Sequence, residues 1–170
     1  VDNFVAVKQI GNFVAFDDNQ KKWATLSSFL GNVEQIYNYS DVVSFELLED
    51  GESVAKGGLG RALVGGALFS GVGAIVGGVT GKRKTTGICN SLRLKLTMDN
   101  IYDPVVYVDF ITSKTKKDGF TYKTLLNSAQ ECLSMFQLIC EKYNKEEEEP
   151  KKSSTTTADE IRQFKKWLDE

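Results

Sequence analysis

The segment 57–84 is the part of the chain whose residue types and spacing most resemble a chemical site. A glycine-rich loop that ends in Gly-Lys binds phosphates when it follows the Walker A pattern. Such a loop ending at Gly81 needs a glycine at position 76 and a serine or threonine at position 83, where the chain has Val76 and Arg83. The same valine breaks a dinucleotide-binding GxGxxG pattern at positions 71–76. We therefore expect no nucleotide site here.

The other reactive residues do not indicate catalysis or metal binding. The chain has no histidine, which removes the commonest general base and metal ligand. Cys89, Cys132 and Cys140 form no CxxC pair and lie in apolar or periodic surroundings, so we expect buried, reduced thiols. The carboxylates are scattered over strands and turns, as at Asp41, Glu46, Asp103 and Asp109. We predict no catalytic residue, no metal site, no cofactor and no enzymatic activity.

Small residues repeat along the same segment, which we call the glycine-rich insert (residues 57–84). It holds ten of the fifteen glycines and has no charge between Arg61 and Lys82. One line of small residues has a spacing of four: Gly58, Ala62, Gly66, Ser70, Ala74 and Gly78. A second line is Gly73, Gly77 and Gly81, and bulky apolar residues lie between, among them Leu63, Leu68, Phe69, Ile75 and Val76. This spacing predicts helices with smooth faces on which another helix can pack closely. A floppy loop and a buried core element remain the alternatives.

The strands expected on either side of the insert constrain its path. If they belong to one sheet, the insert must return to the side that it left. Ser70 and Gly71 provide a natural bend, which leaves two legs of about 10 residues and roughly 15 Å each. A bilayer core is about 30 Å thick. We therefore predict a helical hairpin that packs on itself, dips into one leaflet or stacks with neighbouring subunits.

Basic residues bracket the apolar part of the insert. They are Arg61, Lys82, Arg83 and Lys84. One interpretation is a collar that contacts phosphates or lipid headgroups, each cation contributing about 1 kcal/mol near an anionic surface. The other interpretation is a solvated loop edge, and the sequence favours neither.

The rest of the chain must position this insert, and it is typical of a small α+β domain. Short β-rich runs with polar turns predict strands at 5–10, 13–17, 22–26, 42–48, 92–98 and 105–111. An apolar stripe with spacing three and four, from Leu125 to Tyr143, predicts one long helix that begins at Thr121. Residues 145–157 are charged and then rich in serine and threonine, which favours a linker. Residues 158–170 begin another amphipathic helix.

This order predicts a bent antiparallel sheet or barrel capped by one C-terminal helix, the layout of the pleckstrin-homology (PH) superfold, over residues 1–144. The runs 37–48, 56–66 and 77–84 resemble bacterial and phage proteins in which a DUF4428-type zinc ribbon precedes a PH-like region and a SHOCT helical hairpin follows. Residues 158–170 resemble the first half of SHOCT. The resemblance implies assembly, since SHOCT segments are regarded as oligomerisation elements.

Two functions remain open. The first is a non-enzymatic scaffold that forms homo-oligomers through the insert and the C-terminal helix, because exposed apolar patches usually mark interfaces. The second is a peripheral membrane module that dips the hairpin into one leaflet. The net charge of −2 gives no reason to expect nucleic acid as a partner. We expect a cytoplasmic protein that self-associates or meets another protein or a membrane surface.

Overall fold

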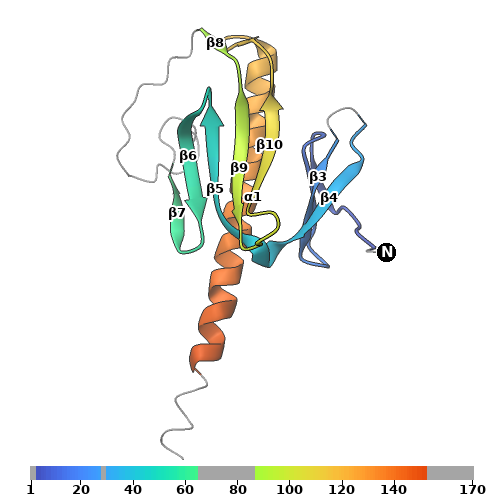
Figure 1. Ribbon diagram of the computed structural model, residues 1–170, viewed down its shortest axis with the longest axis vertical. Coiled ribbons are helices and arrows are strands. Elements are labelled where there is room, and N and C mark those ends of the chain that lie inside the picture. The colour runs from blue at the N-terminus through green and yellow to red at the C-terminus, as the bar shows by residue number, and fades with distance from the viewer. Residues whose placement is uncertain (1–2, 28–29, 65–86, 153–170) are drawn as a thin grey trace, which may run out of the picture.

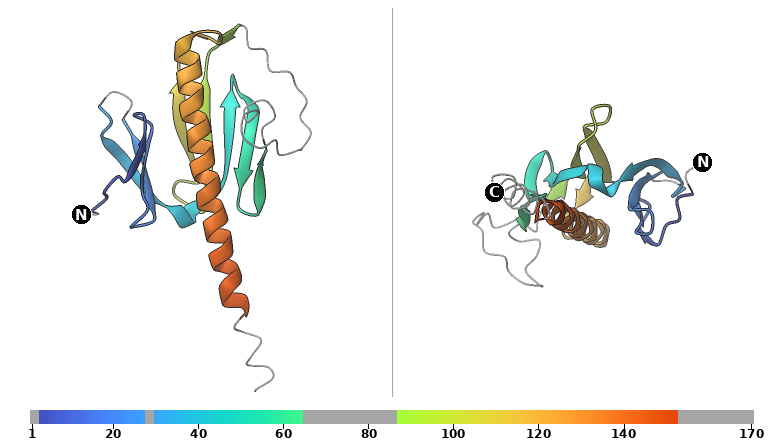
Figure 2. Two further views of the ribbon diagram at one scale, coloured as in Figure 1. Left: turned by 180° about the vertical axis from the view of Figure 1, so that it is seen from behind. Right: turned by 90° about the horizontal axis from the view of Figure 1, so that it is seen from below.

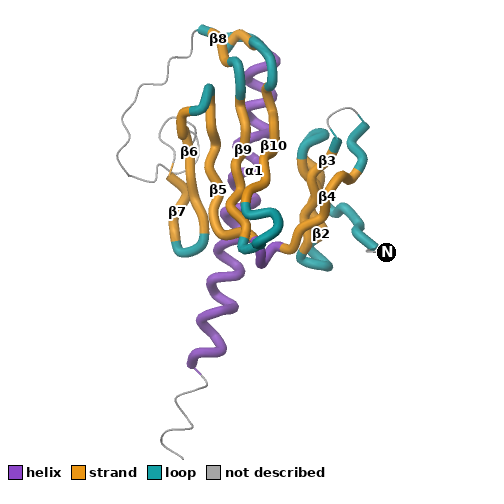
Figure 3. The backbone as a smooth tube through the Cα atoms, in the orientation of Figure 1, coloured by secondary structure: helices purple, strands orange, loops and turns teal. Residues whose placement is uncertain are grey.

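The computed structural model describes residues 3–27, 30–64 and 87–152. Two main antiparallel sheets are followed by one long helix (Figure 1). This arrangement confirms the predicted α+β class and is consistent with a PH-like fold. Figure 3 shows the same order, with strands before the single α-helix of the described ranges.

The first sheet is a meander of four antiparallel strands in sequence order. Its strands are β1 (Lys8–Ile10), β2 (Val14–Asp17), β3 (Lys22–Leu26) and β4 (Val33–Asn38). Polar turns separate the strands. Strands β1, β2 and β3 confirm those predicted at 5–10, 13–17 and 22–26, whereas β4 was not predicted. A short 3₁₀ turn, η1 (Tyr39–Asp41), leads into the second sheet.

The second sheet has five strands in the order β10-β9-β5-β6-β7. They are β5 (Val42–Glu49), β6 (Glu52–Gly58), β7 (Arg61–Val64), β9 (Leu92–Met98) and β10 (Val105–Ile111). In β9 every second residue is buried, as the alternation of Leu92, Leu94 and Leu96 with charged residues predicted. A two-stranded sheet joins β8 (Ile88–Cys89) to β11 (Thr115–Lys116) beyond the end of β9.

Helix α1 (Phe120–Lys152) lies across one face of the five-stranded sheet (Figure 2). The stripe predicted from sequence is the face that packs, since Ala129, Cys132, Leu133, Phe136, Ile139 and Cys140 are all buried. Towards its C-terminal end the helix extends past the sheet (Figure 1). Residues 145–152, expected to be part of a linker, belong to helix α1, and the lysine and glutamates that precede Pro150 are good helix formers.

The strands around the insert differ from the sequence prediction. A helix was predicted from Gly57 onward, but Gly57 and Gly58 end β6, and residues 61–64 form β7. Pairing with β5 explains the difference, because the register of Ser44 with Gly58 carries the five-stranded sheet into the glycine block. The prediction of a helical hairpin is therefore wrong for residues 57–64. Its remaining part, residues 65–84, lies outside the described residues.

Candidate functional site

The insert begins in a β-hairpin, and this hairpin fixes where residues 65–84 start. Strands β6 and β7 pair antiparallel, with Lys56 opposite Val64 and Gly58 opposite Arg61. Of the residues predicted to form an interface, Gly58 is therefore in β6, and Ala62 and Leu63 are in β7. The others lie outside the described residues: Gly66, Leu68, Phe69, Ser70, Gly73, Ala74, Ile75, Val76, Gly77, Gly78 and Gly81. Of the predicted collar, the structure describes Arg61, which is exposed, but not Lys82, Arg83 or Lys84.

Gly57 and Gly58 have a structural role inside the fold. A Cβ atom on Gly57 would lie 2.5 Å from the Phe45 ring and 2.6 Å from Oε1 of Gln137. A Cβ atom on Gly58 would lie 2.6 Å from the backbone oxygen of Val43, and its φ of +154° disfavours a side chain. Both glycines let β6 approach its neighbours closely. Gly58 was predicted as an interface residue; in the structure its missing side chain allows close packing within the domain.

Helix α1 also contacts the β6–β7 hairpin. The side-chain amide nitrogen of Gln137 donates to the carbonyl of Arg61 at 3.1 Å and to Glu141 at 3.0 Å. Leu63 packs against the core. Strand β7, which precedes residues 65–84 of the glycine-rich insert, is thus attached to both the sheet and the helix.

A second anchor lies where the chain re-enters the fold after the insert. Asp50, at the β5–β6 turn, accepts hydrogen bonds from the backbone nitrogens of Asn90 at 2.7 Å and Ser91 at 3.0 Å. Desolvation opposes ionisation of Asp50, but these hydrogen bonds hold its pKa below the ordinary value. The backbone nitrogen of Lys117 donates a hydrogen bond to the Gly87 carbonyl at 3.0 Å. Both ends of the insert are therefore attached to the same folded unit.

A buried polar group supports this second anchor. Glu49 is 5% exposed, forms an ion pair with Lys117 and accepts a hydrogen bond from the Tyr122 hydroxyl at 3.1 Å. Potential ligand atoms of Glu49, Asp50 and Cys89 lie within 4.8 Å of one another. The two carboxylates already bind Lys117, Tyr122 and backbone amides, which accounts for their placement without a metal ion.

The other residues considered for chemistry are dispersed. Asp41 lies in η1, Glu46 in β5 and Asp109 in β10, where its carboxylate pairs with Arg93 at 2.8 Å. All three thiols are buried, as predicted. Burial raises the pKa of the Cys132 thiol and raises that of Cys140 to about 12, so both stay protonated at neutral pH.

Sequence reasoning missed an exposed apolar pair in the β9–β10 loop (residues 99–104). Ile101 is 89% and Tyr102 is 90% exposed. Oδ1 of Asn100 accepts hydrogen bonds from the backbone nitrogens of Tyr102 at 2.9 Å and Asp103 at 3.4 Å. Between the predicted strands 92–98 and 105–111, residues 99–104 fit a turn that begins at Asp99 and Asn100 and ends at Pro104. The available signal was two large apolar residues between Asn100 and Pro104, where a turn usually has small or polar residues.

Comparison with known proteins gives two related sequences of phage origin. An "Immunity protein" of Bacillus phage SPbeta is 26% identical over 116 residues, which is 63% of this chain and 58% of that protein. The "SPbeta prophage-derived uncharacterized membrane protein YomJ" of Bacillus subtilis (strain 168) is also 26% identical over 116 residues, 63% of this chain and 51% of that protein. The chain thus spans little more than half the length of either relative. No solved structure matches significantly.

Two further findings concern the membrane and the family. No helix within the described ranges combines the length and apolar character needed to cross a bilayer. The zinc ribbon and SHOCT parts of the predicted resemblance are not confirmed. The PH-like part of the resemblance is confirmed, because residues 3–112, more than half of the chain, match a family that combines a PH domain with a glycine zipper. The sheets, the C-terminal helix and this match lead to one conclusion: the chain belongs to the family of glycine zipper containing PH domains.

Proposed function

We propose that this chain is a non-enzymatic PH-like scaffold that self-associates through residues 65–81 of the glycine-rich insert. The observation that carries the proposal is the attachment of both ends of the insert to one folded unit, at β7 and at β8. Between these two attachment points lies an uncharged run whose small residues recur every fourth position in the sequence. Such spacing lets backbones pack closely between copies.

The test is the mass of the assembled protein, measured by light scattering in detergent-free buffer and in detergent micelles. In the first variant, residues 66–81 are replaced by a Gly/Ser linker of equal length, which leaves β7 and the basic residues 82–84 in place. We expect the intact chain to form oligomers and this variant to be a monomer. A variant that keeps the mass of the intact chain would contradict the proposal.

A matched pair of variants distinguishes close packing of small residues from nonspecific apolar association. Gly66→Leu with Ser70→Leu and Gly78→Leu blocks the small-residue line and makes the insert more apolar. Val72→Leu with Val79→Leu adds apolar volume off that line. If small residues form the contact, the first variant loses assembly and the second keeps it. Equal assembly by both would show that spacing is irrelevant.

The second candidate function is peripheral membrane association, favoured by the name of YomJ, which is called a membrane protein. In this case the insert contacts lipid and the basic residues 82–84 meet headgroups, at about 1 kcal/mol for each cation. Flotation with vesicles of phosphatidylcholine and phosphatidylglycerol tests it. We expect Lys82→Gln with Arg83→Gln and Lys84→Gln to weaken flotation, and unchanged flotation would contradict it.

The name of the phage relative suggests a process in which such a module would act. That protein is called an immunity protein. We extend to this chain only the proposal that its assembly serves immunity of a host cell. Cells that express the intact chain or the Gly/Ser variant would be challenged with phage. We expect only the intact chain to protect the cells.

A further inference from the structure

The β9–β10 loop has the features of a binding surface. Ile101 and Tyr102 are the most exposed large apolar side chains in the part of the chain that the structure describes. The loop is held at its ends, because the Met98 nitrogen donates to the Pro104 carbonyl at 2.9 Å and the Asp99 nitrogen to the Asp41 carbonyl at 2.7 Å. A tyrosine on a preorganised loop is typical of the energetic centre of an interface.

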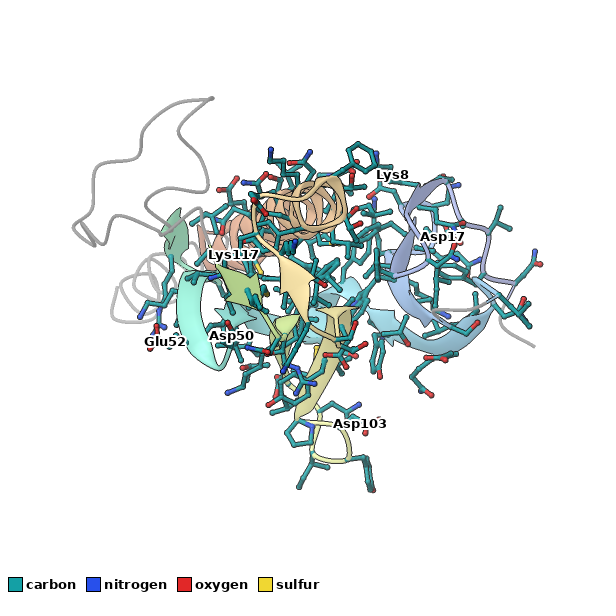
Figure 4. The ribbon with its side chains drawn as sticks, turned by 90° about the horizontal axis from the view of Figure 1, so that it is seen from above. Lys8, Asp17, Asp50, Glu52, Asp103 and Lys117 are labelled. Carbon is teal, nitrogen blue, oxygen red and sulfur yellow. The ribbon has the colours of Figure 1, made fainter. Side chains whose placement is uncertain are left out.

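The surroundings of the loop extend this surface. Val105 is 39% and Tyr107 is 46% exposed on β10, next to the loop. Figure 4 shows Asp103 projecting from the sheet on the side away from α1. The loop and Val105 therefore form an apolar patch that the helix does not cover. Beside it, the Tyr107 ring carries the Arg93 guanidinium, 5.0 Å from the ring centroid.

The apolar patch has a negative border at its loop end, whereas Arg93 and Lys95 lie beside Tyr107 at the other end. Asp99 and Asp103 flank Ile101 and Tyr102, are both exposed, and form no ion pair with a cation in the described ranges. Burial and, after it, the charge of Asp103 raise the pKa of Tyr37 in β4. A negative border disfavours an anionic lipid surface and favours a partner that joins apolar residues to cations.

The chain itself has one segment with that chemistry. Residues 65–81 carry no charge, and three consecutive cations follow at 82–84. Of these three cations, Lys84 cannot reach the loop of its own copy, whereas a second copy can bring all three to it. Lys84 is three residues from Gly87, a reach of about 11 Å at most. Between that end of the sheet and the β9–β10 loop lies the whole of β9, seven residues or about 23 Å.

We propose that the β9–β10 loop of one copy binds the apolar-to-basic end of the insert, residues 75–84, of a second copy. The inference rests on the proposed self-association and adds a second surface to it. Because loop and insert are different surfaces, one contact leaves the loop of one copy and the insert of the other free. Two copies can therefore exchange both contacts in a closed two-fold dimer, or join head to tail in rings or filaments.

Charge reversal tests this contact by sedimentation velocity. The loop variant carries Asp99→Lys and Asp103→Lys, and the insert variant carries Lys82→Glu, Arg83→Glu and Lys84→Glu. Like charges would then face each other in either variant alone, so we expect at least roughly tenfold weaker assembly. An equimolar mixture of the two restores opposite charges at every contact. We expect the mixture to assemble, with each contact joining one copy of each variant.

Controls distinguish a loss of the loop contact from a loss of folding and from a nonspecific effect of net charge. The reversed residues of the loop are exposed, so circular dichroism and thermal unfolding should match those of the unmodified chain. Glu34→Lys with Glu52→Lys makes the same charge change at exposed positions outside the patch and should leave assembly intact. Ile101→Ser with Tyr102→Ser should weaken assembly at every salt concentration, whereas the charge term weakens as salt shortens the Debye length to below about 10 Å.

The outcomes distinguish this inference from the proposed function. If the loop variant assembles like the unmodified chain, or if the mixture does not assemble, the loop contact is overturned, whatever the Gly/Ser variant does. If the Gly/Ser variant still assembles, the proposed function fails on its own measurement. If loop variants lose vesicle flotation and keep assembly, the partner is lipid and the inference is wrong.

Discussion

The indole of Trp23, in β3, meets the ring of Phe136, in α1, edge to face, with ring centroids 5.0 Å apart and ring planes at 84°. The Phe136 ring also lies 5.6 Å from that of Phe16 in β2 and 6.3 Å from that of Phe45 in β5. One helical side chain therefore contacts both main sheets. This contact joins the N-terminal meander to the sheet that carries the glycine-rich insert.

Truncation of Phe136 should weaken the whole domain. Phe136→Ala removes a fully buried ring, so we expect the free energy of unfolding to fall by about 3–5 kcal/mol. Urea denaturation followed by tryptophan fluorescence measures it. Leu138→Ala, at a position 52% exposed in the same helix, is the control and should change stability by about 0.5 kcal/mol or less. Equal losses would contradict the central role of Phe136.

Substitution of Gly58 separates a structural glycine from an interface glycine. Gly58→Ala places a methyl group against the Val43 backbone, so we expect a loss of about 1–3 kcal/mol in unfolding free energy. Thermal unfolding measures it, and Ser53→Ala in the same strand is the control. If Gly58→Ala leaves stability unchanged but abolishes assembly, the residue belongs to an interface after all.

Removal of the Lys117 charge should destabilise the second anchor of the insert. Lys117→Met leaves Glu49 buried without its cation, and breaking such a pair costs about 3–5 kcal/mol. Adding Glu49→Gln should recover part of that loss. Hydrogen exchange of the β8 amides gives a local readout, and the exposed neighbour change Lys116→Met is the control. A double variant no more stable than the single one would exclude the ion pair as the cause.

Asp17 should make stability depend on pH. Its carboxylate accepts hydrogen bonds from the backbone nitrogens of Val5, Gln20 and Asn19, which hold its pKa below the ordinary value. Because the folded-state pKa is lowered, the ionised group stabilises the fold above its unfolded-state pKa. That contribution disappears as pH falls through the folded-state pKa.

Asp17→Asn should therefore lower the urea midpoint at pH 7, and its difference from the unmodified chain should shrink as the pH falls towards 3. Glu34→Gln removes the same charge at an exposed position outside the loop contact and serves as the control. A difference that is constant from pH 7 to pH 3 would rule out the carboxylate charge and leave only the shape of the side chain.

Elements with strong local patterns were predictable from sequence. Leu92, Leu94 and Leu96 alternate with polar residues, and β9 buries them as expected. The three-and-four spacing around Cys132 and Phe136 identified the buried face of α1. Strands β6 and β7 were not predicted, because a run such as Lys56-Gly57-Gly58 has no alternation and glycine has little strand preference.

The sequence by itself determined which face of each patterned element is buried, because that choice depends on residues a few positions apart. It also determined the uncharged, glycine-rich character of residues 65–81. Only the tertiary structure decided that Gly57 and Gly58 serve the fold, that Glu49 finds Lys117, and that Ile101 and Tyr102 stay uncovered. Each of these depends on which distant segments the sheet brings together. Local periodicity does not encode such contacts.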